Sequence, residues 1–359
     1  MCGFSGEITF DGRPATADTV ARMAAPLASR GPDASGLWQQ DRAALAHRRL
    51  KIIDLSDRSQ QPMVDPVLGL SIAFNGCIYN YAALKAELEG MGYLFFSEGD
   101  TEVVLKAYHA WGPDCAKRFH GMFAFVVIER DSGRVALARD RFGIKPLYLS
   151  SDEGGRRLRF ASSLPALLAA GDIDGAIDPV GLHHYMSFHA VVPAPFTILE
   201  QVRKLPPATV SIFERDGRRT DHIYWTLTFE RDSEAIETPY VEWRQRLRQA
   251  LRTAVDRRMV ADVPVGVLLS GGVDSSLIVG LLAAAGQQQL KTFSIGFEEV
   301  NGEKGDEFRY SDLIAERFQT QHHKVFVKSK RLIEALPKTI AAMSEPMVSY
   351  DNVAFYLLS

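Results

Sequence analysis

The hydrophobic pattern of this 359-residue chain changes once, near Leu205-Pro206-Pro207. Before that point, short strand-like runs are separated by turn signals and helical segments. After a last hairpin signal at Asp216-Gly217, long helical segments alternate with single apolar runs. A chain of this length is also too long for one compact core. The pattern therefore predicts two domains of different class, over 2–212 and 238–359, joined by a linker over 213–237.

The first part has the pattern of an α+β domain. Alternating apolar residues predict strands, and helical spacing predicts helices between them. The expected strands are Phe4–Phe10, Leu70–Phe74, Phe123–Glu129 and Val135–Arg139, and the expected helices are Thr16–Ser29, Tyr81–Glu89 and Thr101–Trp111. Asp131-Ser132-Gly133 joins the last two strands and predicts a hairpin there.

The second part has the alternation typical of an α/β domain. Its expected helices are Pro239–Ala261, Ser275–Ala284 and Phe308–Phe318, and its expected strands are Val263–Leu269, Lys291–Gly296 and Lys324–Val327. Helices and strands in this succession predict a parallel sheet with helices on its faces.

Composition excludes several classes of function. A formal net charge of −3 gives no general attraction to phosphate backbones or anionic lipid, so a nucleic-acid partner is not expected. No apolar run approaches the ~20 residues that span a bilayer, so no membrane partner is expected. The three cysteines, Cys2, Cys77 and Cys115, do not resemble a secreted disulfide framework. We expect a cytoplasmic protein.

Cys2 is the first candidate for chemistry. Aminopeptidases commonly remove an initiator methionine before a small residue, and the mature chain is then expected to begin with Cys2. An N-terminal cysteine supplies a thiol nucleophile together with its own base, because a free α-amine has a pKa of about 7.7–8.0. The alternative is an incidental cysteine at position two. Cys115, in contrast, lies in a helical stretch and is predicted to pack as a small apolar group.

Six motifs follow Met1 in order. They are Met1-Cys2-Gly3, Arg30-Gly31-Pro32-Asp33, His47-Arg48-Arg49-Leu50, Asn75-Gly76-Cys77-Ile78-Tyr79-Asn80, Gly99-Asp100-Thr101-Glu102 and Arg139-Asp140-Arg141-Phe142-Gly143-Ile144-Lys145-Pro146-Leu147-Tyr148. Together they resemble class II glutamine amidotransferases, with asparagine synthetase as the nearest general relative. The resemblance implies an αββα N-terminal nucleophile hydrolase sandwich, followed by a doubly wound ATP-pyrophosphatase domain.

The resemblance also implies a glutaminase site. Attack of a thiolate on an amide creates an oxyanion, which donors placed in advance must stabilise. The Asn75 side chain and the Gly76 backbone N–H are implied as those donors, although Asn-Gly alone is typical of a tight turn. The glutamine-binding residues implied are Arg49, Ile52 and Asp100. Arg49 suits the α-carboxylate of glutamine, because a guanidinium pairs with it in a bidentate fashion.

Cys77 departs from the family pattern. Relatives have a glutamate there, which holds the α-ammonium of glutamine together with the counterpart of Asp100. Losing the second carboxylate is expected to weaken the hold on glutamine, with Asp100 as the main anchor.

A second site is predicted where the apolar run Val263–Leu269 leads into Ser270-Gly271-Gly272-Val273-Asp274-Ser275. A glycine turn before a helix N-terminus exposes backbone N–H groups to phosphate. The segment resembles the pyrophosphate loop of enzymes that split ATP between its α and β phosphates. The resemblance implies ATP and Mg²⁺ as cofactors. The implied ATP-binding residues are Leu268, Ser270, Gly271, Gly272, Asp274, Ser275 and Ile295, with Asp274 also as a magnesium ligand.

The implied reaction is glutamine-dependent amide formation at a carboxylate acceptor. The motifs around His47–Ser56, Phe74–Tyr81 and Gly99–Gly112 resemble the branch that amidates N-acetylglutaminylglutamine, and aspartate is the alternative acceptor. Two further alternatives are a catalytically silent glutamine-binding module and a structural partner whose fold has lost its activity. The protein partner considered is a second copy of the chain, in a homodimer. The chain ends without the Ser-Gly-x-Gly-x-Asp-Glu segment of relatives. We expect a C-terminally truncated chain that retains glutaminase chemistry at best.

Overall fold

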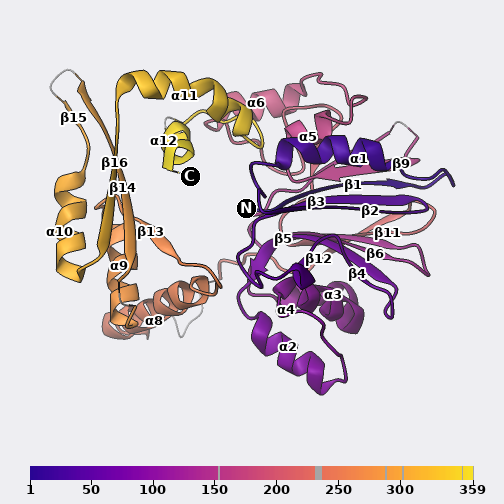
Figure 1. Ribbon diagram of the computed structural model, residues 1–359, viewed down its shortest axis with the longest axis horizontal. Helices are drawn as coiled ribbons and strands as arrows, with labels where there is room; N and C mark the ends of the chain where they lie inside the picture. Colours follow the sequence, from indigo (N-terminus) through magenta and orange to yellow (C-terminus); the bar gives the residue numbers. More distant parts are fainter. Residues whose placement is uncertain (153, 231–236, 288, 301–302, 350, 359) are drawn as a thin grey trace. The chain divides into compact units, whose positions relative to one another are not determined.

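A computed structural model of the chain is shown in Figure 1, and it describes residues 1–152, 154–230, 237–287, 289–300, 303–349 and 351–358. The chain forms two compact units. The first contains Met1–Leu227 together with Met343–Val348, and the second contains Thr228–Ala342 together with Ser349–Ser359.

Two six-stranded antiparallel sheets form the first unit. One sheet has the order β10-β8-β9-β1-β3-β2, and the other has the order β12-β11-β7-β6-β5-β4. The strands of the first sheet are β1 (Gly3–Thr9), β2 (Ala34–Gln40), β3 (Ala43–Arg49), β8 (Tyr148–Ser151), β9 (Arg157–Ala161) and β10 (Arg203–Lys204). Those of the second are β4 (Met63–Asp65), β5 (Leu70–Ile78), β6 (Gly121–Glu129), β7 (Val135–Arg139), β11 (Thr209–Phe213) and β12 (Arg219–Ile223).

Helices cover the outer face of each sheet. α1 (Ala17–Ala24) and α5 (Leu164–Leu168) lie on the outside of the first sheet, and α2 (Tyr81–Gly90), α3 (Asp100–Trp111) and α4 (Cys115–Arg118) lie on the outside of the second (Figure 1). Apolar side chains from both sheets, including Phe4, Val126 and Phe160, are fully buried between them. The unit is therefore an αββα sandwich, the predicted class. Cys115 is fully buried in the core beneath the second sheet, which confirms the packing role.

The structure confirms one local prediction of the first unit and corrects two. The hairpin at Asp131-Ser132-Gly133 is confirmed, because β6 and β7 pair across it. The helix expected over Thr16–Ser29 is shorter, since Pro26 lies in the 3-10 turn (Ala25–Leu27) that ends it. The linker expected over 213–237 is wrong in its first part, because β12 lies there and pairs with β11. Within that stretch, 231–236 lie outside the described residues.

The second unit contains a mixed sheet. β13 (Gly266–Leu268) and β16 (Gln321–Val327) pair in parallel with β14 (Lys291–Val300), and β15 (Glu303–Gly305) pairs with β14 antiparallel. Its helices are α8 (Tyr240–Arg258), α9 (Val273–Ala284), α10 (Phe308–Phe318), α11 (Ser329–Ala342) and α12 (Asp351–Leu358). In contrast to these, α6 (Pro179–Ser187) is a helix of the first unit. The predicted parallel pairing is confirmed for β13, β14 and β16, whereas β15 departs from it.

None of the helices that the structure describes combines the length and apolar character needed to cross a membrane.

Candidate active site

All six residues predicted for the glutaminase site line one pocket of about 240 Å³ in the first unit. Cys2 lies just before β1, Arg49 ends β3, and Ile52 lies in the loop after it. Asn75 and Gly76 lie in β5, and Asp100 begins α3. The tertiary structure thus brings together residues up to 98 positions apart in the sequence.

Cys2 lies immediately before β1, at the end of a central strand. Its Sγ accepts a hydrogen bond from the Leu50 N–H at 3.3 Å and lies 3.5 Å from the Leu50 carbonyl oxygen. Arg30 Nε donates to the Cys2 carbonyl oxygen at 3.3 Å. Burial raises the pKa of the Cys2 thiol, with Asp100 adding to the effect and Leu50 opposing it. The sulfur is therefore held in place as a neutral thiol that needs a base before it can attack.

Asn75 has a buried side chain without a hydrogen-bond partner. It is 1% exposed, and neither Oδ1 nor Nδ2 has a partner among the described residues. A buried amide is normally satisfied, and leaving one unpaired costs about 1–3 kcal/mol. Asn75 lies within β5, where it pairs with Ala124, so the tight-turn interpretation of Asn-Gly is wrong. The amide is positioned to bind a ligand in the pocket.

Gly76 follows in the same strand, and its backbone lies against β6. A Cβ atom there would lie 2.5 Å from the Met122 carbonyl oxygen and 2.8 Å from the Phe123 Cα, so only glycine fits. The Tyr79 N–H donates to the His120 carbonyl oxygen, on the side of β6. Alternate residues of a strand bond to the same neighbour, and Gly76 is an odd number of residues from Tyr79. By the alternation of an antiparallel ladder, the Gly76 N–H points away from β6 and towards the pocket edge.

Two residues that the sequence did not single out hold β5 at this edge. The Phe74 N–H donates to Gln61 Oε1 at 2.7 Å, and His47 Nε2 donates to the Phe74 carbonyl oxygen at 3.0 Å. Burial lowers the pKa of His47 to about 4, so the ring is neutral at physiological pH. The motif His47-Arg48-Arg49 contains one of them, but only the cross-sheet contact reveals its role.

Arg49 organises the loop that follows β3. Its guanidinium donates to the carbonyl oxygens of Ile53 at 3.4 Å and Ser56 at 2.8 Å, and also to that of Asp54. A guanidinium has five N–H donors, and the three bonds to this loop leave donors for a ligand carboxylate. The loop in turn carries Ile52 to the pocket.

Asp100 and Cys77 lie together on the opposite wall. Asp100 Oδ2 accepts a hydrogen bond from the Ile78 N–H at 3.0 Å. Burial raises the pKa of Asp100 to about 7, and burial followed by the charge of Asp100 raises the pKa of the Cys77 thiol to about 12. Cys77 is therefore a neutral wall residue, and Asp100 is the carboxylate of this wall that can meet an ammonium group.

Lys145 is a further pocket residue that the sequence placed only within a longer motif. It is 3% exposed and lines the pocket with Cys2. Its position follows from the loop after β7, where the Lys145 N–H donates to Asp140 Oδ2.

A separate pocket of about 580 Å³ lies in the second unit. It contains three of the predicted ATP-binding residues, Leu268, Ser270 and Ile295. Apolar side chains such as Phe293 and Phe355, together with Asp351 from α12, complete its walls. The other four predicted residues do not line this pocket. They lie in the adjoining loop, Gly271 and Gly272, and in the first turn of α9, Asp274 and Ser275.

That loop has the geometry of a glycine turn before a helix. Gly271 has φ +87°, and a Cβ there would lie 2.6 Å from the Tyr310 Cβ, so glycine is required on two counts. The Gly272 N–H donates to Ser270 Oγ at 3.2 Å, and Ser275 Oγ donates to the Gly272 carbonyl oxygen at 3.2 Å. Asp274 is exposed in the first turn of α9.

The magnesium prediction has one carboxylate to support it. Within the described residues, no group of three His, Cys, Asp or Glu side chains is arranged to hold a metal ion. Mg²⁺ commonly takes one or two protein carboxylates and completes its shell with phosphates and water. Asp274 fits that mode of binding, beside the exposed start of α9.

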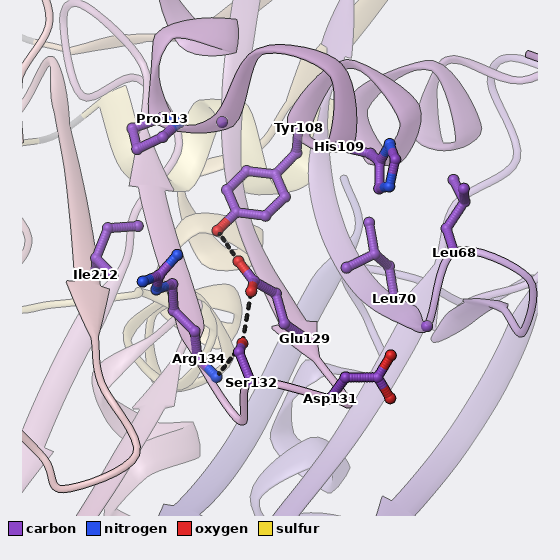
Figure 2. Close-up of a pocket in the computed structure, with 12 residues that line it drawn as sticks. Leu68, Leu70, Tyr108, His109, Pro113, Glu129, Asp131, Ser132, Arg134 and Ile212 are labelled. Atoms are coloured by element: carbon purple, nitrogen blue, oxygen red, sulfur yellow. Dashed lines mark hydrogen bonds between the residues drawn. The ribbon is translucent and has the colours of Figure 1, made fainter.

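Another pocket of the first unit, of about 400 Å³, lies away from Cys2 (Figure 2). Figure 2 shows Glu129 bonded on both oxygens, to the Tyr108 hydroxyl at 2.7 Å and the Ser132 hydroxyl at 2.6 Å. Arg134, on the same wall, forms an ion pair with Glu214 at 3.2 Å. These polar groups satisfy one another, so we assign no chemistry to this pocket.

A cysteine placed before the first strand of an αββα sandwich defines the class of N-terminal nucleophile hydrolases. Comparison with known proteins specifies the family. Residues 1–225 match the model of the glutamine amidotransferase domain, and residues 246–359 match that of asparagine synthase. The chain belongs to the asparagine synthase family of glutamine amidotransferases.

Two relatives of known sequence agree with this assignment. Asparagine synthetase (glutamine-hydrolysing) 1 of Bacillus subtilis is 33% identical over 100% of this chain and 55% of its own length. Asparagine synthetase (glutamine-hydrolysing) 3 of the same organism is 31% identical over 98% of this chain and 58% of its own length. The chain thus spans little more than half of these two relatives. A solved glutamine phosphoribosylpyrophosphate amidotransferase of B. subtilis has a TM-score of 0.48 at 16% identity, over 93% of this chain and 92% of that one.

Proposed function

We propose that the part of the chain over 2–212 hydrolyses glutamine to glutamate and ammonia at Cys2. The observation that supports this most is the unpartnered buried amide of Asn75 in the same pocket as the Cys2 thiol. An amide left without partners in the folded protein is available to an oxyanion formed beside the nucleophile.

The reaction divides into two halves. After removal of Met1, the α-amine of Cys2 takes the thiol proton, and the sulfur attacks the side-chain amide carbon of glutamine. Asn75 Nδ2 and the Gly76 N–H stabilise the oxyanion. The carbon–nitrogen bond then breaks, ammonia leaves with the proton held by the α-amine, and a thioester remains on Cys2. Water, deprotonated by the same amine, attacks the thioester, and the departing sulfur recovers a proton as glutamate is released.

The remaining pocket residues hold glutamine in place. We assign its α-carboxylate to Arg49, its α-ammonium to Asp100 and its aliphatic chain to Ile52. Cys77 supplies no charge at this wall, because its thiol stays neutral. Asp100 therefore carries the recognition of the ammonium by itself, and we expect a weaker hold on glutamine than two carboxylates provide.

The part over 238–359 is proposed to contribute to an ATP-dependent, amide-forming ligase. Leu268 and Ile295 border the adenosine in this proposal, and the loop from Ser270 to Ser275 binds phosphates through backbone N–H groups. Mg²⁺ would be held by Asp274 and the phosphates, where it offsets their charge. The relatives named as glutamine-hydrolysing asparagine synthetases support this activity for the whole protein.

The acceptor is a carboxylate compound. We propose N-acetylglutaminylglutamine, on the resemblance of the motifs around Cys77 to that branch, and aspartate is the second candidate because the relatives are named asparagine synthetases. A homodimer in the cytoplasm completes the proposal. Assays of the full-length gene product with both acceptors, scored as amide and AMP formed, decide between them.

The test of the glutaminase is direct. The purified chain, with Met1 removal verified by intact mass, is expected to release ammonia and glutamate from glutamine. Cys2→Ala is expected to abolish both products, and Cys115→Ala, at a buried cysteine outside the pocket, is expected to retain them. A processed, folded chain that releases no ammonia would show a silent glutamine-binding module instead.

A further inference from the structure

Lys145 is a buried cation in the pocket that holds Cys2. Its side chain is 3% exposed, and its Nζ lies 2.9 Å from the sulfur of Met1. No acidic side chain of the described residues forms an ion pair with it. An ammonium removed from water without a carboxylate is costly. Because buried charges are concentrated at functional sites, a lysine in the pocket of the nucleophile is a candidate functional residue.

The loop after β7 holds Lys145 rigidly in this place. The Lys145 N–H donates to Asp140 Oδ2 at 2.9 Å, and its carbonyl oxygen accepts from Arg139 Nε at 2.8 Å. Asp140 also accepts from the N–H groups of Phe142 and Ile144, at 3.1 and 2.9 Å. The backbone of Lys145 is thus fixed on both sides, and its ammonium is aimed at the start of the chain.

Several charged and titratable groups face this ammonium. They come from four parts of the first unit: the chain start with its amine and Cys2, the segment after α1 with Arg30, β5 with Cys77, and the loop of Lys145 itself with Asp140. Asp33 also faces the amine, and Arg49 and Asp100 face the Cys2 thiol. Arg30 and Lys145 are the cations whose charges act on the Met1 amine.

We propose that Lys145 is a positioning residue that keeps the α-amine of the mature Cys2 unprotonated, and so ready to take the thiol proton. The proposal rests on the glutaminase mechanism given above. Arg30 Nε bonds the Cys2 carbonyl oxygen, and Lys145 Nζ lies against the Met1 side chain and lines the same pocket as Cys2, so both positive charges lie at the chain start. Protonation of the amine would add a third positive charge at this place. Repulsion from the other two disfavours it in a partly dehydrated pocket.

The electrostatics of the chain start agree with this. Burial lowers the pKa of the Met1 amine, one residue before the amine of the mature chain, and the charges of Arg30 and Lys145 lower it further, against Cys2 and Asp33. The Cys2 thiol has a raised pKa and therefore holds its proton until a base removes it. A neutral amine beside a neutral thiol is the combination that a proton shuttle requires.

The first experiment measures the amine without using activity. In a Cys2→Ala background, which leaves an N-terminal amine but no competing thiol, trace acetylation with acetic anhydride is followed against pH on the N-terminal peptide. Adding Lys145→Met is expected to raise the titration midpoint by about one pH unit. Lys145→Arg, which retains the charge, is expected to restore it. An unchanged midpoint in the Lys145→Met chain overturns the proposal.

The second experiment uses the chain with Cys2 intact. Lys145→Met is expected to shift the acidic limb of kcat/KM for glutamine hydrolysis upwards by the same interval, so that activity below the limb falls about tenfold. Lys117→Met, at an exposed lysine on α4, is the control for the loss of one positive charge and is expected to leave the limb in place. A uniform loss of kcat without a shift of the limb contradicts the proposal.

The two readouts separate the possible failures. A shifted amine midpoint in a chain without glutaminase activity would refute the proposed function and leave the role of Lys145 towards the amine intact. An active chain with an unshifted midpoint would refute the role of Lys145 alone. If thermal unfolding shows that Lys145→Met does not fold, Lys145→Gln provides the same loss of charge with a polar side chain.

Discussion

His47 Nε2 lies 3.0 Å from the carbonyl oxygen of Phe74, so a side chain of one sheet holds the backbone of the other, one residue before Asn75. Gln61 binds the N–H of the same residue. The position of the proposed oxyanion donors is therefore set by a contact between the two sheets, in addition to the ladder within one of them.

His47 is expected to make the fold sensitive to acid. Its pKa in the folded protein is about 4, against 6.5 for an ordinary histidine, so the unfolded chain binds more protons between these values. Stability from this group is complete above the higher value and is lost as the pH falls towards the lower one, by up to about 3 kcal/mol. Urea unfolding of His47→Gln across this range should show a flatter acid dependence, whereas His222→Gln, at an exposed site on β12, should match the parent chain.

Asn75→Leu is expected to separate activity from stability. The leucine has a similar shape, and no hydrogen bond within the protein is lost, so thermal stability should be equal or higher. Loss of an oxyanion donor should lower kcat for glutamine hydrolysis by about 10²–10³ with little change in KM.

The matched control for Asn75 is Asn80→Leu. Asn80 Nδ2 donates to the Arg118 carbonyl oxygen at 3.0 Å, and its Oδ1 accepts from the His120 N–H at 2.8 Å. This substitution should cost about 1–3 kcal/mol of stability. A large loss of stability in Asn75→Leu would show that its amide has a structural partner after all.

Gly76→Ala is expected to damage the site through its backbone. The added Cβ meets the Met122 carbonyl oxygen and Phe123 on β6, which cannot retreat without breaking the ladder. We expect a loss of about 2 kcal/mol in chemical unfolding, together with loss of glutaminase activity. Gly90→Ala, at the end of α2 with no atom within 4 Å of the new Cβ, should be neutral or stabilising.

Asp100 is expected to make glutamine binding dependent on pH. With a pKa of about 7, its carboxylate is charged above neutrality and able to bind the α-ammonium, whereas below it is protonated. KM for glutamine should therefore rise as the pH falls through this value, by about tenfold per unit. Asp100→Asn should have a raised KM without this pH dependence, and a KM that still varies in the same way would exclude Asp100 as the group responsible.

The stability effect of Asp100 has the opposite sign to that of His47. Its folded pKa lies above the ordinary 3.8, so the folded chain binds more protons between the two values, and stability falls as the pH rises through them. Asp100→Asn retains an acceptor for the Ile78 N–H and is therefore expected to raise the melting temperature at neutral pH.

The sequence alone determined the local pattern and the motifs of this protein. The spacing of apolar residues, alternating in strands and helical in helices, indicates the class of each half. It does so because this spacing shows which face of each element is buried. Cys2, Arg49, Asn75, Gly76 and Asp100 were selected from ordered motifs, and all five line one pocket. The glycine turn before α9 was also evident, because its strand, glycines and helix start are contiguous.

Only the tertiary structure decided which groups at this pocket lack partners and which hold others in place. Whether an amide is paired depends on atoms from distant segments, so the orphaned side chain of Asn75 could not be foreseen. The same holds for His47 across the two sheets and for Lys145 at the chain start, which forms no ion pair within the described part of the chain. The linker expected over 213–237 is wrong in its first part for a related reason, since β12 is highly exposed and is a strand because β11 pairs with it. Hydrogen bonding and burial are properties of neighbours in space, and a single sequence specifies those neighbours only through the fold.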